Sequence, residues 1–323
     1  MNILAGQWQP YRLPLATPWI TQRGRRDALH GEWLRLSTDD GRQGWGDAAP
    51  LPEFGIPPAA ARAFARETAL LDLAAQERGL PLNALLSLQP AVPSLTVHRN
   101  LGAISRIDPQ RVAESLHPAC SLLKLKVGVI SWTDEIQALE ALCAHLPGSV
   151  RLRLDANQAW PAGIAADFLR ACVTHGLPVE SIEEPLRADD GPSLRHQLRA
   201  LQATTPFAIA VDESANQIDS AFLRDPPVRR LVIKPARHGG LLASLLLARR
   251  ASAAGLECIV TSALESQCGV LACAHLAAAI APRATHGLHA PAVAGTNAPR
   301  QGREPPTFIL PEQPGLGFRG PTG

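Results

Sequence analysis

From Ser94 onward, short apolar segments alternate with amphipathic ones. Strand-like segments span 94–100, 122–128, 150–157, 179–185, 207–214, 229–235, 257–263 and 285–291, the last having the least regular pattern. Helical patterns lie between them, for example over residues 131–146, 161–176 and 240–255. Eight strands joined in this way by helices are typical of a parallel barrel. The pattern therefore predicts a (β/α)8-type barrel.

The first third of the chain has the pattern of an α+β unit. Residues 30–38 and 42–51 alternate like two strands around the turn Asp39–Gly41, which predicts a hairpin. Residues 57–79 run from proline through an alanine-rich body to glycine, as one long helix does, and 80–87 predict a shorter helix.

These patterns divide the chain into three parts. A stretch with two prolines, residues 88–94, separates the first unit from the barrel. We therefore expect an α+β domain over residues 1–93 and a barrel over residues 94–291. A tail rich in Gly and Pro, residues 292–323, is expected to pack back on the first domain.

Polar residues fall at one position of the repeat, where each strand ends. Six segments end in a charged or hydroxyl residue: Lys126, Asp155, Glu183, Asp212, Lys234 and Ser262. Successive members are 28 or 29 residues apart, apart from one step of 22. All six are therefore expected at the carboxyl-terminal mouth of the barrel, where active sites of such barrels are built.

Each of these motifs also has a purely structural explanation. Residues 124–126 could form a half-exposed strand, and residues 155–157 a turn. Residues 183–184 and 212–214 could begin helices, and Lys234 could extend its charge to solvent. Such coincidences rarely keep one spacing across six units, which favours a shared site.

The residue types indicate the chemistry of that site. Three carboxylates from neighbouring strands, Asp155, Glu183 and Asp212, repel one another unless a cation lies between them. An all-oxygen set with room for water and substrate suits Mg²⁺, with Mn²⁺ as a possible substitute. Removal of a proton α to a carboxylate is the chemistry that such a metal supports, because the metal stabilises the enolate.

Lysines accompany the carboxylates. Lys124 and Lys126 share one face of a strand, since side chains alternate along it, and Lys234 ends the strand after Asp212. A desolvated lysine beside another ammonium group has a lowered pKa. We therefore expect Lys124 to lower the pKa of Lys126, and Lys126 to act as the base.

Composition excludes several other classes. The 31 basic and 29 acidic residues nearly balance and only 4% of residues are aromatic, which argues against nucleic-acid binding. The six cysteines lack C-x-x-C spacing, which argues against a disulfide framework or a zinc site and is typical of free thiols in a reducing compartment. The N-terminus lacks a signal-peptide pattern, and the longest apolar run, Gly269–Pro282, is too short to span a bilayer. We expect a soluble, cytoplasmic protein that acts without a membrane.

Taken in order, the motifs KLKVG, RLDAN, IEEP, VDES and VIKP resemble those of the muconate-lactonizing branch of the enolase superfamily. The resemblance covers nearly the whole chain and implies an α/β fold: a modified (β/α)7β barrel with an N-terminal α+β capping domain. GWGDAAPLPEFG and RLDANQAW resemble, more narrowly, the o-succinylbenzoate synthases, dehydratases of menaquinone biosynthesis. A small carboxylate substrate is implied, and a homo-oligomer is possible.

The same resemblance implies roles for individual residues. Lys126 would abstract the proton and return it to the leaving hydroxyl, Lys234 would stabilise the enolate, and the three carboxylates would hold Mg²⁺. Thr261 and Ser262 would contact the substrate. Arg153 and Asn157 are further candidate substrate contacts, although a structural ion pair explains Arg153 equally well. The loops 21–26 and 51–55 would close over the site.

Two departures from the family pattern leave the substrate open. TSALES replaces a run of serines, and His289 stands where an acidic residue is common. Glu184 and Glu213 are expected to orient the metal ligands, and His98 to have a core or surface role. Three rivals remain: an N-acylamino acid racemase or dipeptide epimerase, with one lysine serving each stereochemical direction; a cycloisomerase; and a binding module without catalysis.

Overall fold

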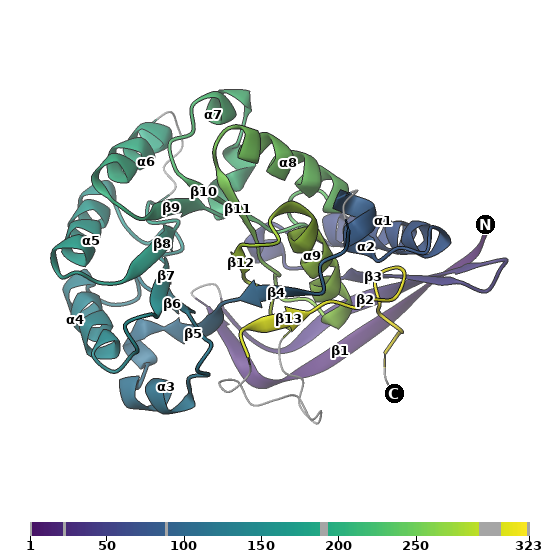
Figure 1. Ribbon diagram of the computed structural model, residues 1–323, viewed down its shortest axis with the longest axis horizontal. Helices are drawn as coiled ribbons and strands as arrows, with labels where there is room; N and C mark the ends of the chain where they lie inside the picture. Colours follow the sequence, from purple (N-terminus) through teal and green to yellow (C-terminus); the bar gives the residue numbers. More distant parts are fainter. Residues whose placement is uncertain (1, 22–23, 88–89, 188–192, 291–304, 322–323) are drawn as a thin grey trace.

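The computed structural model describes residues 2–21, 24–87, 90–187, 193–290 and 305–321. An antiparallel sheet in the order β1-β2-β3 forms the N-terminal unit together with two helices (Figure 1). Its elements are β1 (Ile3–Thr21), β2 (Gly24–Thr38), β3 (Gln43–Ala48), η1 (Pro52–Phe54), α1 (Pro58–Glu77) and α2 (Leu82–Ser87). The predicted hairpin is confirmed, since Ser37 of β2 pairs with Gln43 of β3.

A curled parallel sheet of seven strands, in the order β11-β10-β9-β8-β7-β6-β5, forms the barrel. Its strands are β5 (Arg99–Ala103), β6 (Leu122–Lys126), β7 (Arg151–Asp155), β8 (Val179–Glu183), β9 (Ala208–Val211), β10 (Arg230–Ile233) and β11 (Glu257–Val260). The helices are η2 (Ile104–Arg106), α3 (Pro109–Ser115), α4 (Trp132–Cys143), α5 (Ala162–Thr174), α6 (Ser193–Thr204), η3 (Glu213–Gln217), α7 (Ser220–Arg224), α8 (Leu241–Ala253) and α9 (Gln267–Ile280).

A small sheet, β12-β4-β13, closes the barrel. It comprises β4 (Ser94–Val97), β12 (Thr285–His286) and β13 (Thr307–Ile309). A bridge between Thr261 and Gly287 connects β11 to β12, and β4 continues into β5. The predicted barrel with an N-terminal α+β cap is thus confirmed.

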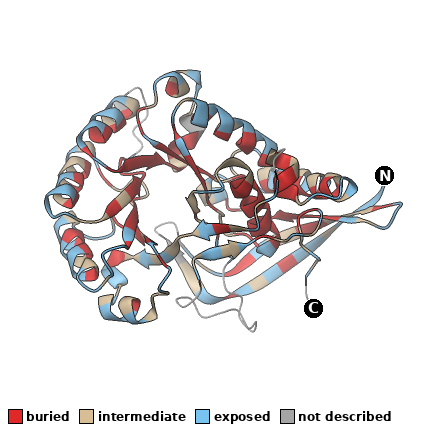
Figure 2. Cartoon of the chain, in the orientation of Figure 1, coloured by how far each residue is buried: buried red, intermediate tan, exposed pale blue. Residues whose placement is uncertain are grey.

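Helix α9 occupies the junction between cap and barrel. It contacts α2 and β3 on the cap side and β4 and β11 on the barrel side, and nearly its whole length is buried (Figure 2). A helix that is apolar all round belongs in a core.

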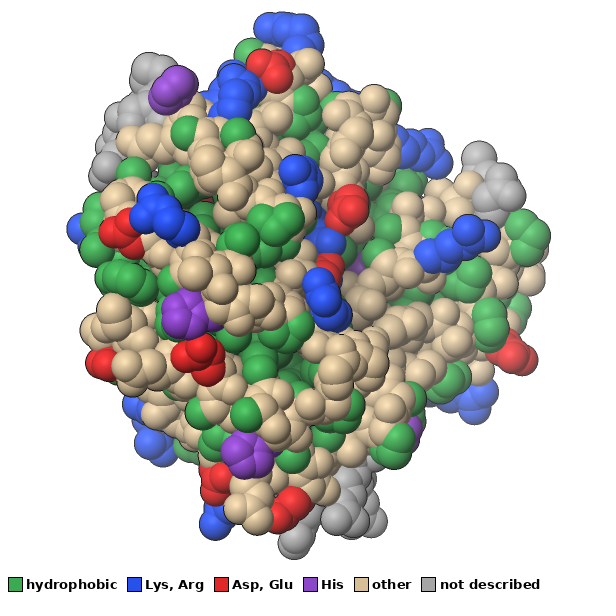
Figure 3. All heavy atoms as spheres, turned by 60° about the vertical axis from the view of Figure 1, so that its left-hand side comes forward, with side chains coloured by type: hydrophobic (Ala, Val, Ile, Leu, Met, Phe, Trp, Pro, Cys, Tyr) green, Lys and Arg blue, Asp and Glu red, His purple; other side chains and the backbone are tan. Residues whose placement is uncertain are grey.

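In the described part of the chain, no helix is long and apolar enough to cross a membrane. Basic and acidic side chains are interspersed on the face shown in Figure 3.

Two glycines of the GWG motif set the packing of the cap. A Cβ atom at Gly44 would lie 2.3 Å from the Ala69 carbonyl oxygen, and one at Gly46 would lie 1.9 Å from that of Ala65. Both carbonyls belong to α1, so only glycine lets this helix lie so close to β3. Asp47 follows on the same strand and accepts hydrogen bonds from the backbone N–H and the hydroxyl of Ser266, at 2.8 and 2.7 Å, at the start of α9.

The first strand, β1, is absent from the sequence-based expectation. It runs for 19 residues and contains Pro10, Pro14 and Pro18, which argue against a strand. β1 lies at the edge of its sheet, pairing with β2 alone, so its free side tolerates residues without an N–H group.

The C-terminal segment contacts both units. Its strand β13 pairs with β4 of the barrel, and beyond it the Leu316 N–H donates to Asp72 of α1 at 2.8 Å. The expected boundary at residue 291 lies outside the described residues.

His275 of α9 links the C-terminal segment to α2. Its Nδ1 accepts from the Asn83 N–H and its Nε2 donates to the Leu316 carbonyl, both at 3.1 Å. The ring is fully buried, and this burial lowers the pKa from the usual 6.5 to about 4. A second proton would also remove the acceptor that Asn83 requires.

Acidification is therefore expected to destabilise the fold through His275. The unfolded chain takes up this proton near pH 6.5 and the folded chain only near pH 4, so the contribution of His275 to stability is constant above that window and falls as the pH is lowered through it. At about pH 5 the expected loss is roughly 2 kcal/mol in the free energy of unfolding. Urea titrations at two pH values measure it. His275→Asn should reduce the pH dependence by this amount and leave the share of the other buried histidines, His238 and His286 among them, whereas the exposed control His145→Asn should not reduce it. Equal slopes in both variants would contradict the assignment.

Candidate active site

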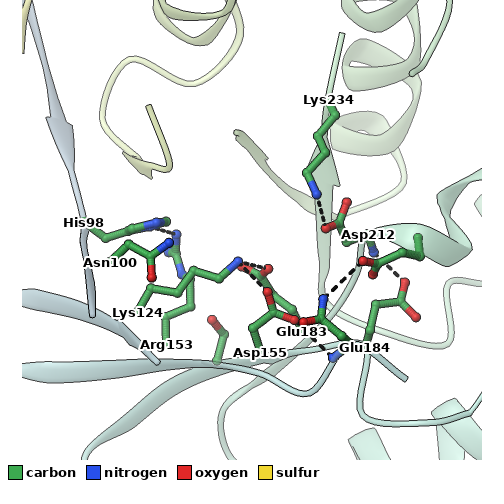
Figure 4. Close-up of polar contacts among 12 residues, drawn as sticks. His98, Asn100, Lys124, Arg153, Asp155, Glu183, Glu184, Asp212 and Lys234 are labelled. Carbon is green, nitrogen blue, oxygen red and sulfur yellow. Dashed lines mark hydrogen bonds and ion pairs between the residues drawn. The ribbon is translucent and has the colours of Figure 1, made fainter. Parts of the chain in front are cut away.

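The predicted polar residues lie together at the carboxyl ends of the barrel strands. Lys126, Asp155 and Glu183 are the last residues of β6, β7 and β8 and are direct neighbours in the sheet register. Asp212 and Lys234 immediately follow β9 and β10. The spacing therefore located one edge of the barrel correctly. Figure 4 shows side chains from these strands converging there.

Lys124 bridges two of the three carboxylates. Its Nζ lies 2.9 Å from Asp155 Oδ2 and also contacts Glu183 Oε2. Burial alone would lower the pKa of Lys124, but the charges of Asp155 and Glu183 outweigh it and the pKa is raised. Lys124 is thus an ammonium group paired with carboxylates. Its charge interacts with Asp155 and Glu183, whereas the sequence-based expectation concerned only its effect on Lys126.

Two cations hold the third carboxylate. Lys234 Nζ lies 2.5 Å from Asp212 Oδ2, while Arg237 contacts Asp212 Oδ1 and donates to its backbone carbonyl at 2.6 Å. Burial would raise the pKa of Asp212, but Lys234 and Arg237 lower it instead. The sequence-based expectation missed Arg237. Gly55 lies against it, since a Cβ there would be 3.1 Å from Arg237 Cδ, so the capping-domain loop reaches the site.

The donor set fits a hard divalent cation. Asp155, Glu183 and Asp212 are all oxygen donors on adjacent strands, and Glu183 Oε1 is buried without a hydrogen-bond partner. Among the described residues, no three such side chains are already grouped closely enough to hold a metal ion. The residues therefore match Mg²⁺ in type and in their position on adjacent strands, while their oxygens bond Lys124, Lys234 and Arg237 in this structure.

Glu184 and Glu213 support the carboxylates from behind. Glu184 accepts from the backbone N–H groups of Asp212 (2.6 Å) and Ser214 (2.7 Å), which ties the end of β8 to that of β9. Burial, reinforced by Asp212, raises the pKa of Glu213 to about 7. Asn157 Nδ2 donates to Glu213 Oε1 at 3.2 Å, so its amide joins this network.

Two of the expected substrate contacts bond protein groups in this structure. Arg153 is only 1% exposed and bonds Glu180 through Nε and Nη2, deeper in the barrel than Asp155. It is the structural ion pair. Ser262 lies one residue beyond the strand-end position, and its hydroxyl accepts from the His289 N–H at 3.1 Å. Thr261 has the position in register with Lys234, because Val260 pairs with Ile233.

All lysines of the chain lie in this site. Of the 31 basic residues only Lys124, Lys126 and Lys234 are lysine, and every other one is arginine. A lysine can lose its proton near neutral pH when its environment is adjusted, whereas arginine does not. This composition is a sequence signal for amine chemistry that spacing alone did not supply.

A capped (β/α)7β barrel whose strand ends carry three carboxylates between lysines defines a class of metal-assisted enzymes. Residues 110–320 match the family model described as Enolase C-terminal domain-like, which is well over half of the chain. The protein therefore belongs to the enolase superfamily.

Individual relatives lie in several branches. An o-succinylbenzoate synthase from Edwardsiella ictaluri is 30% identical over 291 residues, covering 86% of this chain and 87% of the relative. An L-Ala-D/L-Glu epimerase from Bacillus subtilis is 30% identical over 260 residues, covering 79% and 69%. The structure of a dipeptide epimerase from Enterococcus faecalis V583, complexed with Mg and L-Leu-L-Tyr, has a TM-score of 0.83 at 22% identity, covering 98% and 99%.

Proposed function

We propose that the protein is an o-succinylbenzoate synthase-like dehydratase of menaquinone biosynthesis. Such a hydro-lyase removes a proton α to a carboxylate and eliminates water. One observation carries the proposal: Lys126 at the end of β6 and Lys234 just after β10 lie on either side of the three strands whose carboxyl ends present Asp155, Glu183 and Asp212. Dehydratase relatives aligned over most of the chain support the choice of reaction.

The chain's own residues perform the proton transfers. Lys126, as a neutral amine, takes the α-proton and delivers it to the leaving hydroxyl, so that water departs and a double bond forms. Lys234 lies across the site and donates to the developing negative charge. Lys124, two residues before the base on the same face, adds a positive charge beside it.

The three carboxylates are proposed to hold Mg²⁺, with Mn²⁺ as a substitute. When bound, this cation supplies the positive charge that stabilises the dianion formed on proton removal. The dipeptide epimerase structure with Mg shares this fold. A small-molecule carboxylate is the proposed partner, and the enzyme is expected to act in the cytoplasm, alone or as a homo-oligomer.

A racemase or epimerase is the second candidate, with a cycloisomerase as a further variant of the same chemistry. Lysines on two sides of one α-carbon permit proton exchange in both stereochemical directions, and an epimerase relative aligns over most of the chain. The eighth-strand segment 287–290 argues against a dipeptide epimerase, because its sequence GLHA has no acidic residue.

Turnover in D₂O distinguishes these reactions. The purified protein with Mg²⁺ is incubated with the cyclohexadiene carboxylate that is the substrate of o-succinylbenzoate synthases and, separately, with N-succinylamino acids. The masses of the products are then measured by mass spectrometry. Loss of one water from the first substrate is the expected result. Deuterium entering an N-succinylamino acid without dehydration would replace the dehydratase with a racemase. If neither reaction took place, the proposal would be overturned.

A further inference from the structure

His98 lies at the seam where the barrel closes, level with the strand-end residues of the site. The His98 N–H donates to the His286 carbonyl, and Gly287 N–H to that of Val260, both at 3.0 Å. His98 is therefore in register with Gly287, which bridges Thr261. It also precedes Lys126 by 28 residues, the same step that separates other strand ends.

The imidazole ring of His98 fills space that Gly287 leaves open. A Cβ atom at Gly287 would lie 2.8 Å from His98 Cε1 and 2.7 Å from Thr261 Cγ2. The Cε1–Nε2 edge of the ring thus packs against a bare backbone, beside a threonine. The Thr261 hydroxyl is buried and has no hydrogen-bond partner within the described chain.

Arg153 determines which nitrogen of His98 carries the proton. Arg153 Nη1 lies 3.1 Å from His98 Nδ1, and a guanidinium group can only donate, so Nδ1 accepts and the hydrogen is on Nε2. Glu180 and the Thr285 carbonyl hold the guanidinium in place. Burial, followed by the charge of Arg153, keeps the pKa of His98 well below its usual value. The ring is a neutral donor of fixed orientation.

The seam faces the carboxylates across the barrel. Counting around the closed sheet, β12 is the eighth strand and β8 the fourth, so Gly287 and Glu183 lie on opposite sides. A substrate whose reacting carboxylate lies at β7–β9 therefore directs its other end toward His98 and Thr261. Figure 4 shows His98 beside Lys124, on the side of the site away from Lys234. An ammonium group there would meet an N–H donor and a nearby cation.

We propose that His98 is a substrate-binding residue whose Nε2–H donates to a carbonyl or carboxylate oxygen at the substrate end remote from the abstracted proton. The Thr261 hydroxyl is the second polar group of this subsite. The inference rests on the proposed function, since it takes the α-proton side from Lys126. It defines the substrate class as one with an oxygen acceptor, and not an ammonium group, at its far end.

Two amide variants separate binding from support of Arg153. The amide of His98→Asn reaches only the position of Nδ1, so it keeps an acceptor for Arg153. The amide of His98→Gln reaches the position of Nε2 and keeps the donor. Calorimetry with Mg²⁺ compares the binding of o-succinylbenzoate, which has a remote carboxylate, and of benzoate, which lacks one. His145→Gln, on an exposed helix end, is the control.

His98→Asn is expected to weaken o-succinylbenzoate binding about tenfold or more and to leave benzoate unchanged, while His98→Gln retains most of the affinity. Equal affinity in both variants and the control would overturn the role of His98, as would no binding by the unaltered protein. Binding needs no turnover: His98-dependent binding without any reaction overturns the proposed function alone. Turnover with KM independent of His98 overturns this inference alone.

Discussion

Lys126→Ala is expected to abolish dehydration and, with it, any exchange of the substrate α-proton with D₂O. A positioned general base contributes about 10²- to 10⁴-fold to such a step, and no other described amine lies on β6 facing the mouth except Lys124, which is paired with Asp155 and Glu183. The loss should appear in kcat and not in substrate affinity. Single-turnover assays measure dehydration, and deuterium incorporation followed by mass spectrometry measures exchange of the α-proton.

Lys126→Arg is the matched variant, because it keeps the positive charge but cannot supply a neutral base. It should be as inactive as Lys126→Ala, while the exposed Arg170→Ala on α5 should be fully active. If Lys126→Ala still exchanged the α-proton at the original rate, Lys234 would have to be the base. A dehydratase in which Lys234→Ala alone loses exchange would reverse the two roles.

Glu183→Gln is expected to remove metal binding and therefore activity. Glu183 is fully buried, and its Oε1 lacks a partner in the described structure, so neutralising it deletes a ligand and leaves Lys124 with Asp155 alone. A ligand present at 100 times its Kd stabilises the fold by about 2.7 kcal/mol, and this Mg²⁺-dependent gain should disappear. Thermal unfolding with and without Mg²⁺ measures the effect without relying on turnover.

Glu180→Gln provides the comparison on the same strand. Glu180 bonds Arg153 and Arg230 below the mouth, and Arg230 and Arg153 hold its pKa at about 2 despite burial. Its replacement should lower the unfolding temperature yet preserve the additional stabilisation by Mg²⁺. A Mg²⁺ response that survives in Glu183→Gln would show that the metal, if bound, uses other ligands.

The sequence predicted the barrel and its polar strand ends because both follow from a regular repeat. Apolar strands must alternate with amphipathic helices to be covered on both faces, and parallel strands place their carboxyl ends at one edge. Lys126, Asp155 and Glu183 therefore line up in register with no further information.

Other features depend on contacts that no local pattern encodes. Arg153 has the same phase as Asp155, but its long side chain turns inward to Glu180, 27 residues ahead. Arg237 reaches Asp212 from a turn after its strand. Strand β1 escaped prediction because its prolines are tolerated only at a sheet edge, and edge position is a property of the assembled sheet. Thr261 and Ser262 differ by one residue, and a strand's exact end decides between them.

The confinement of every lysine to the site makes the protein a convenient subject for spectroscopy. Uniform labelling of lysine with ¹⁵N would yield side-chain signals from only three amines, all at the carboxyl-terminal mouth of the barrel. Their titration curves could be followed one by one without crowding from the surface. Amine-directed reagents would likewise have few targets besides the N-terminus, so protection by a bound carboxylate would report directly on occupancy of the site.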